Sequence, residues 1–204
     1  MVHEACGHGL EGDLVQKGLS AYAGKIGQQV ASEKITVIDD ATIPGKYGSY
    51  QYDDEGHAGQ KTVLIENGIL KQYMNDYQTA ARTGTALTGN GRRESYREKP
   101  ITRMSNTYIA PGNDKVEDII SSTEYGLYVK QMGGGQVNSL NGDYVFDVAE
   151  GYLIEHGEIT LHPLFQFRER KEEKGKENEG VRGCLEKVGE LQDRQKLELA
   201  GEKL

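Results

Sequence analysis

The chain has 204 residues, and its 27 glycines, 12 tyrosines and lack of tryptophan favour a turn-rich β structure over a helical bundle. Its formal charge of −8 argues against direct nucleic-acid binding, because basic side chains on phosphates supply most of that affinity. Since it has no apolar run of about 20 residues, no signal-peptide pattern at its start and only two cysteines, we expect a cytoplasmic protein without membrane contact.

The sequence opens on residue types that bind metals, HEACGH, with His3, Glu4 and His8 as the candidates. Imidazole nitrogens bind zinc and iron well, and a carboxylate beside a metal can accept a proton from bound water. Five positions separate the histidines, which on a regular α-helix turns their side chains roughly 140° apart. Widening of the helix to i→i+5 pairing, which Gly7 permits, would bring them together. From the residues alone, a metal site and a chance surface pair both remain open.

Strand signals begin after this segment. Residues 30–39 alternate between apolar and polar types and predict a strand that ends at Asp39-Asp40. Farther on, apolar-rich runs flank Asn67-Gly68, the preferred pair for a two-residue type I′ hairpin turn. Similar runs flank Asn141-Gly142 and His156-Gly157. Together these elements predict an antiparallel sheet built from hairpins.

Gly-rich connectors separate these elements, at residues 44–60, 83–96 and 132–136. Loops of this length on a sheet often carry function. In the first connector, we interpret the acidic triplet from Asp53 to Glu55 as a solvated turn rather than a metal loop. In the second, Arg92 and Arg93 suit a carboxylate, a phosphate or a nearby glutamate, and the residues alone leave these alternatives open.

One helix is predicted outside the opening segment, after Asn113 or Asp114, either of which can cap its first turn. Side chains that share one face recur at helical spacing from Val116 to Thr123. Gly126 lies where a left-handed residue would end the helix.

The end of the chain differs in kind from what precedes it. From Arg168 onward there are ten basic and ten acidic residues and no aromatic ones. Such a composition suits either a solvated amphipathic helix or a disordered segment. We therefore expect residues 1–165 to form the folded domain and residues 166–204 to form a separate charged tail, disordered or helical.

The opening string HEACGHGLEGD resembles the TldD/PmbA family of metallopeptidases, in its TldD branch. Matches continue in the same order through GSYQYDDEG, TVLIENGIL, TGNGRRESY and GGGQV, and the resemblance extends to about residue 162. It implies a metal-dependent peptidase that acts on short or unfolded peptides and works as a homo- or heterodimer. It also implies that His3 and His8 bind one divalent metal ion, zinc or iron, and that Glu4 is the general base.

The fold that we expect is α+β: a curved antiparallel sheet built from the hairpins, with the HExxxH helix and one further helix packed on it. In the family a large N-terminal domain precedes this motif, and a downstream cysteine supplies a third metal ligand. Cys184 lies in a charged context unlike that segment, and Cys6 is better interpreted as a small packing residue. We therefore expect an incomplete fragment, and the abrupt change from β-patterned sequence to the charged tail suggests a change of reading frame near residues 163–168.

Three functional hypotheses follow from these observations. The first is hydrolysis of short or unfolded peptides by metal-activated water, with this chain supplying part of the site. The second is a non-catalytic remnant or dimerisation module that lacks a complete metal site. The third, which the family's older naming implies, is regulation of a DNA-handling enzyme, and the charge of −8 argues only against direct DNA contact.

Overall fold

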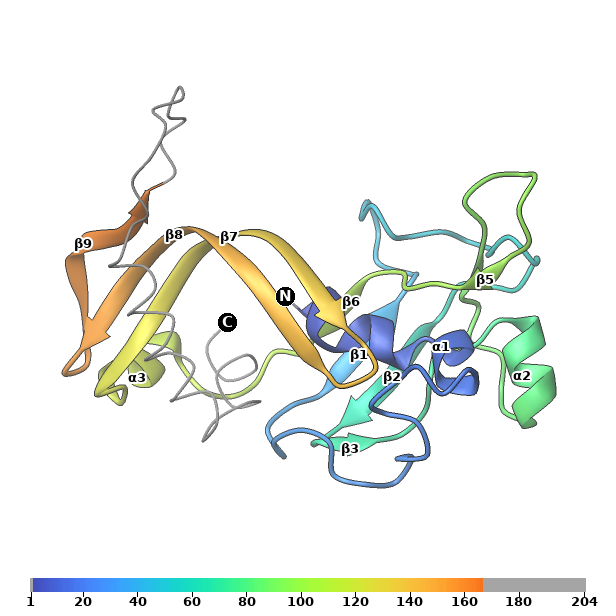
Figure 1. Ribbon diagram of the computed structural model, residues 1–204, viewed down its shortest axis with the longest axis horizontal. Helices are drawn as coiled ribbons and strands as arrows, with labels where there is room; N and C mark the ends of the chain where they lie inside the picture. Colours follow the sequence, from blue (N-terminus) through green and yellow to red (C-terminus); the bar gives the residue numbers. More distant parts are fainter. Residues whose placement is uncertain (1, 167–204) are drawn as a thin grey trace. The chain divides into compact units, whose positions relative to one another are not determined.

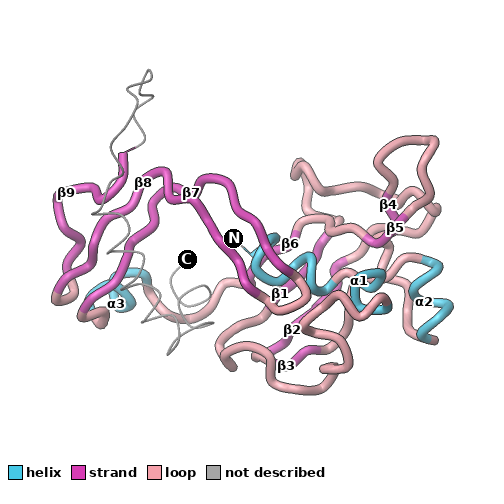
Figure 2. Tube along the Cα trace, in the orientation of Figure 1, coloured by secondary structure: helices cyan, strands magenta, loops and turns pink. Residues whose placement is uncertain are grey.

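The computed structural model describes residues 2–166, in which short helices combine with antiparallel sheets (Figures 1 and 2). The α+β class predicted from the sequence is confirmed, although the strands form three sheets rather than one. The described residues divide into two compact units, the first made of residues 2–112 and 135–145 and the second of residues 113–134 and 146–166. Apart from its first residue, the predicted charged tail over residues 166–204 lies outside the described residues, and the boundary at residue 165 stays a prediction.

The first unit contains an antiparallel four-stranded sheet in the order β3-β2-β1-β6. Its strands are β1 Val37–Asp40, β2 Lys61–Glu66, β3 Ile69–Leu70 and β6 Thr107–Ile109. The strand predicted over residues 30–39 therefore begins later than expected and ends at Asp40. The reason is tertiary, because Val30 and Ala31 donate to the Gly68 carbonyl and Gly68 donates to Ile35, so this segment wraps the β2–β3 turn.

Two of the three predicted hairpin turns have the expected form. Asn67-Gly68 has φ values of 48° and 78°, and His156-Gly157 has values of 52° and 80°, as a type I′ turn requires. The third turn is longer than the predicted two residues, since the connection from β7 to β8 spans residues 139–142. There only Gly142 has a positive φ, because the Asn138 and Asn141 side chains accept from the backbone and hold a wider turn.

Substituting Gly68 with Ala is expected to lower the free energy of unfolding of the chain more than the same change at Gly142. Both residues are left-handed, with φ of 78° and 83°, which costs a residue with a Cβ roughly 1–2 kcal/mol. At Gly68 the new Cβ would also collide with the carbonyl oxygens of Ala31 and Ser32, which adds about 1–3 kcal/mol. At Gly142 the nearest atom, Ala21 Cβ, lies 3.9 Å away. Urea unfolding of the two variants measures the difference, and equal losses would contradict this account.

Four side chains at the centre of the first unit are fully buried, namely Leu10, Leu64, Leu70 and Met74. Val2 and Cys6 pack against the same core from the start of the chain. The opening helical segment therefore lies on the sheet, as predicted, with its apolar residues inward. The helical elements of this unit are η1 His3–Gly7, η2 His8–Leu10, α1 Gly12–Gln16 and α2 Tyr77–Thr83, and a two-stranded sheet joins β4 Gly91–Arg92 to β5 Ile101–Thr102.

Helix α2 was not predicted, although both of its ends carry local signals. The Asp76 carboxylate accepts from the Thr79 backbone N–H at 2.6 Å, and the Thr79 hydroxyl accepts from the Asp76 N–H at 2.9 Å. This is a reciprocal capping box. Gly84 ends the helix in the left-handed conformation, with φ of 68°. These two ends are local signals from which the helix could have been proposed.

The second unit contains helix α3, Val116–Ser121, and most of a three-stranded sheet in the order β7-β8-β9 (Figure 1). Its strands are β7 Tyr125–Asn138, β8 Asp143–Glu155 and β9 Glu158–Gln166, and α3 contacts β9. Within residues 2–166, no helix is both long and apolar enough to cross a membrane.

Three predictions about this region are wrong. Helix α3 begins after Lys115 rather than after Asn113 or Asp114, and Gly126 lies in β7 rather than ending the helix. The backbone turns into the strand because the Thr123 and Glu124 carbonyls accept from the β8–β9 turn. The expected connector at residues 132–136 is likewise part of β7.

Candidate metal centre

The helix that carries the candidate ligands is widened as the histidine spacing required. Residues His3–Gly7 form a π-helix, in which the His8 backbone N–H donates to the His3 carbonyl five residues earlier. The lack of a side chain at Gly7 matters for packing, because a Cβ there would collide with the sulfur of Met104. The helix narrows again over His8–Leu10 and ends at Glu11, whose backbone is extended.

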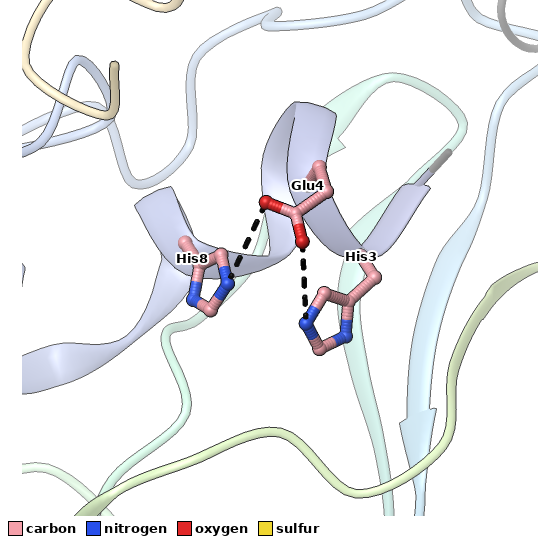
Figure 3. A group of neighbouring side chains, drawn as sticks. All are labelled: His3, Glu4 and His8. Atoms are coloured by element: carbon pink, nitrogen blue, oxygen red, sulfur yellow. Dashed lines mark ion pairs between the residues drawn. The ribbon is translucent and has the colours of Figure 1, made fainter. Parts of the chain in front are cut away.

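The widened turn brings the three candidate side chains together. The rings of His3 and His8 have centroids 4.8 Å apart and planes inclined by 81°. Figure 3 shows the Glu4 carboxylate between the two rings, with Oε1 3.9 Å from His3 Nε2 and Oε2 3.8 Å from His8 Nε2. These separations are too long for hydrogen bonds, so the three groups face one another but are not hydrogen-bonded to one another.

The chemistry of this group fits a divalent transition metal. One donor atom from each of the three side chains lies within 4.8 Å of the others, and two imidazoles with a carboxylate suit zinc or iron. The side chains are 55%, 28% and 30% exposed for His3, Glu4 and His8, so solvent reaches all three. Among the described residues, this is the group of such side chains close enough to hold an ion.

A second layer of contacts surrounds His8. Its Nδ1 lies 3.2 Å from Glu11 Oε2, and the Arg103 guanidinium donates to the same oxygen at 3.1 Å. The hydrogen bond to Glu11 raises the pKa of His8. Partial desolvation, reinforced by the neighbouring His8, lowers the pKa of His3. Sequence reasoning missed Glu11 and Arg103, although Glu11 follows His8 at a spacing of three within the opening string.

The other residues weighed in the sequence hold loops rather than joining this centre. Asp53 is buried and accepts from the backbone N–H groups of Glu55, His57 and Gly91. The acidic triplet therefore closes a turn. The Arg92 and Arg93 side chains donate to the carbonyls of Met104 and Asp54.

Cys6 lies within the widened turn but faces the core. Its thiol donates to the Val2 carbonyl at 3.4 Å, and burial raises its pKa to about 12. A thiol held in its protonated form is a poor metal ligand, because thiolate is the binding species. This agrees with its interpretation as a packing residue, while Cys184 lies outside the described residues.

Known proteins that are similar to this chain are described as metallopeptidases or metalloproteases. Residues 1–164 match the family described as the PmbA/TldA metallopeptidase C-terminal domain. A metalloprotease TldD homologue from Buchnera aphidicola subsp. Acyrthosiphon pisum is 53% identical over 160 residues, which make up 78% of this chain and 33% of that protein. A zinc metalloprotease TldD homologue from Saccharolobus solfataricus is 37% identical over 158 residues, or 77% of this chain and 35% of that protein.

Solved structures agree with these relatives. The crystal structure of TldE from Thermococcus kodakarensis aligns with a TM-score of 0.67 at 33% identity, covering 78% of this chain and 36% of that one. The chain thus spans about a third of the length of the relatives that it matches.

Proposed function

Since the chain belongs to the PmbA/TldD family of metallopeptidases, we propose that His3 and His8 bind one divalent metal ion and that Glu4 is the general base of peptide hydrolysis. The observation that carries this proposal is the π-helical turn, which brings together two imidazoles five positions apart in sequence and the carboxylate of Glu4. Relatives named metalloproteases support the reaction, and one named a zinc metalloprotease supports zinc over iron.

Each side chain has a separate task in this proposal. The Nε2 atoms of His3 and His8 face Glu4 and would hold the ion, which when bound supplies Lewis acidity and lowers the pKa of bound water. The lowered pKa of His3 favours its neutral imidazole, the form that binds metals, whereas the raised pKa of His8 means that a proton competes with the metal there at lower pH. Glu4 takes up the proton of the attacking water, for which its carboxylate is placed beside both nitrogens.

The proposal includes substrates and partners. We expect short or unfolded peptides as substrates, because the group is part-exposed and extended chains can reach it. Dimerisation with a copy or a related family member, and a cytoplasmic location, also stay predictions. The alternative is a non-catalytic remnant or dimerisation module that lacks a complete metal site, which is supported by a group that offers two imidazoles and one carboxylate among the described residues.

Metal loading followed by metal removal tests the proposal. The purified chain is stripped with a chelator, reloaded with zinc or iron(II), and assayed for bound metal and for cleavage of a short unstructured peptide. Because the described residues offer two imidazoles, we expect about one ion per chain, held weakly, and slow cleavage that the chelator abolishes. No binding above that of a His3→Ala/His8→Ala double variant would contradict the proposal. Bound metal without cleavage would favour the remnant instead.

A further inference from the structure

We propose that Glu11 is a positioning residue of this centre, which holds the His8 ring so that Nδ1 donates and Nε2 is left free for the metal. The inference rests on the proposed function, in which His8 is a metal ligand. Glu11 is not among the side chains whose donor atoms lie within 4.8 Å of one another in the candidate group, so it acts through His8 rather than on the ion.

The contacts of one carboxylate oxygen set the roles of the His8 nitrogens. Glu11 Oε2 receives the Arg103 guanidinium at 3.1 Å and lies 3.2 Å from His8 Nδ1. The guanidinium of Arg103 pairs with Glu11 as a carboxylate, and a carboxylate can only accept hydrogen bonds, so His8 Nδ1 is the donor. A neutral imidazole has one donor and one acceptor nitrogen. Its Nε2, the atom 3.8 Å from Glu4, is therefore the acceptor that a metal needs (Figure 3).

The burial of Glu11 points to a role beyond packing. Its side chain is fully buried, and its second oxygen, Oε1, has no hydrogen-bond partner among the described residues. A buried carboxylate with an unpaired oxygen costs stability compared with an apolar residue of similar size. Glu11 follows Leu10, which belongs to the core, so an apolar side chain would suit the position. The carboxylate contacts His8 and Arg103, and because the Arg103 side chain is 46% exposed and can be solvated by water, the contact with His8 is the one that needs a buried carboxylate.

The backbone holds Glu11 in place for this task. Glu11 is extended between η2 and α1 and forms a bridge with Met74. The bridge is closed on both sides, since Met74 N–H donates to Leu10 and Gly12 N–H donates to Met74, at 3.0 and 2.9 Å. A Cβ at Gly12 would lie 2.6 Å from the Met74 carbonyl oxygen, so only glycine allows this approach. The backbone at Glu11 is therefore held in place while its side chain contacts His8.

The test combines cobalt binding with the protonation of the ring. Co²⁺ titrations, followed by visible absorption, compare the wild-type chain with Glu11→Leu and Glu11→Gln. Loss of a carboxylate behind a ligating histidine is expected to weaken metal affinity about 10–100-fold. The matched control is Lys17→Gln, which breaks the exposed Lys17–Asp13 ion pair nearby and should leave cobalt affinity unchanged.

Two further readouts separate positioning from structure. Urea unfolding should show that Glu11→Leu is at least as stable as the wild type, whereas a structural role predicts a loss. Nitrogen NMR of the metal-free chain in alkaline buffer should show the Nδ1–H form of His8 in the wild type and the Nε2–H form in Glu11→Leu.

Unchanged cobalt affinity or an unchanged ring form in Glu11→Leu would overturn the inference while leaving the proposed function standing. A wild-type chain that binds no cobalt would overturn the proposed function. In that case the NMR measurement still decides whether Glu11 orients His8.

Discussion

Replacing Glu4 with Gln is expected to slow peptide cleavage about 10²–10⁴-fold, the usual contribution of a general base. The amide keeps the size of the side chain between the two rings but cannot accept the proton of the attacking water. Metal binding should change little, since the two imidazoles remain. The measurement is kcat/KM for a short unstructured peptide with zinc-loaded protein, together with the zinc content of each preparation.

The matched control for this variant is Glu66→Gln. Glu66 is half-exposed on β2 and pairs with Lys71 at 3.2 Å, so losing its charge should leave cleavage unchanged. If Glu4→Gln cleaves as fast as the wild type, Glu4 is not the base. If the variant instead loses its zinc, Glu4 is a ligand and another group must take the proton.

Replacing His3 or His8 with Ala is expected to weaken zinc binding by more than about 100-fold. Loss of a residue that only contacts a metal ligand already weakens metal affinity by up to about 100-fold, and loss of the ligand itself should weaken it more. His8→Ala should have the larger effect of the two, since His8 is the ring that the Glu11 carboxylate holds in place for the metal. Isothermal titration calorimetry with zinc gives the affinities, and circular dichroism checks that each variant is folded.

The control for the histidine variants is His57→Ala. His57 stacks on Tyr77 with ring centroids 6.5 Å apart and does not belong to the candidate metal group. Its loss should leave zinc affinity unchanged. An equal fall in affinity for all three variants would mean that zinc binds non-specifically to histidines and that the proposed centre is wrong.

The sequence by itself determined the features that depend on a few neighbouring residues. The spacing of His3 and His8 required a widened turn for their rings to meet, and the i→i+5 hydrogen bond between their backbones is present. The turns at Asn67-Gly68 and His156-Gly157 follow from residue types that tolerate positive φ. In each case the backbone conformation depends on steric contacts between residues within about one turn of one another. These residues can be read directly from the sequence.

Only the tertiary structure decided the features that depend on distant partners. Glu11 meets Arg103 across 92 residues of chain, and no local pattern reveals that its carboxylate is buried behind His8. Likewise the helix predicted up to Gly126 ends early because the distant β8–β9 turn donates to the carbonyls of Thr123 and Glu124. Contacts between residues far apart in sequence form only when the whole core packs. The sequence immediately around each residue therefore does not specify its distant partner.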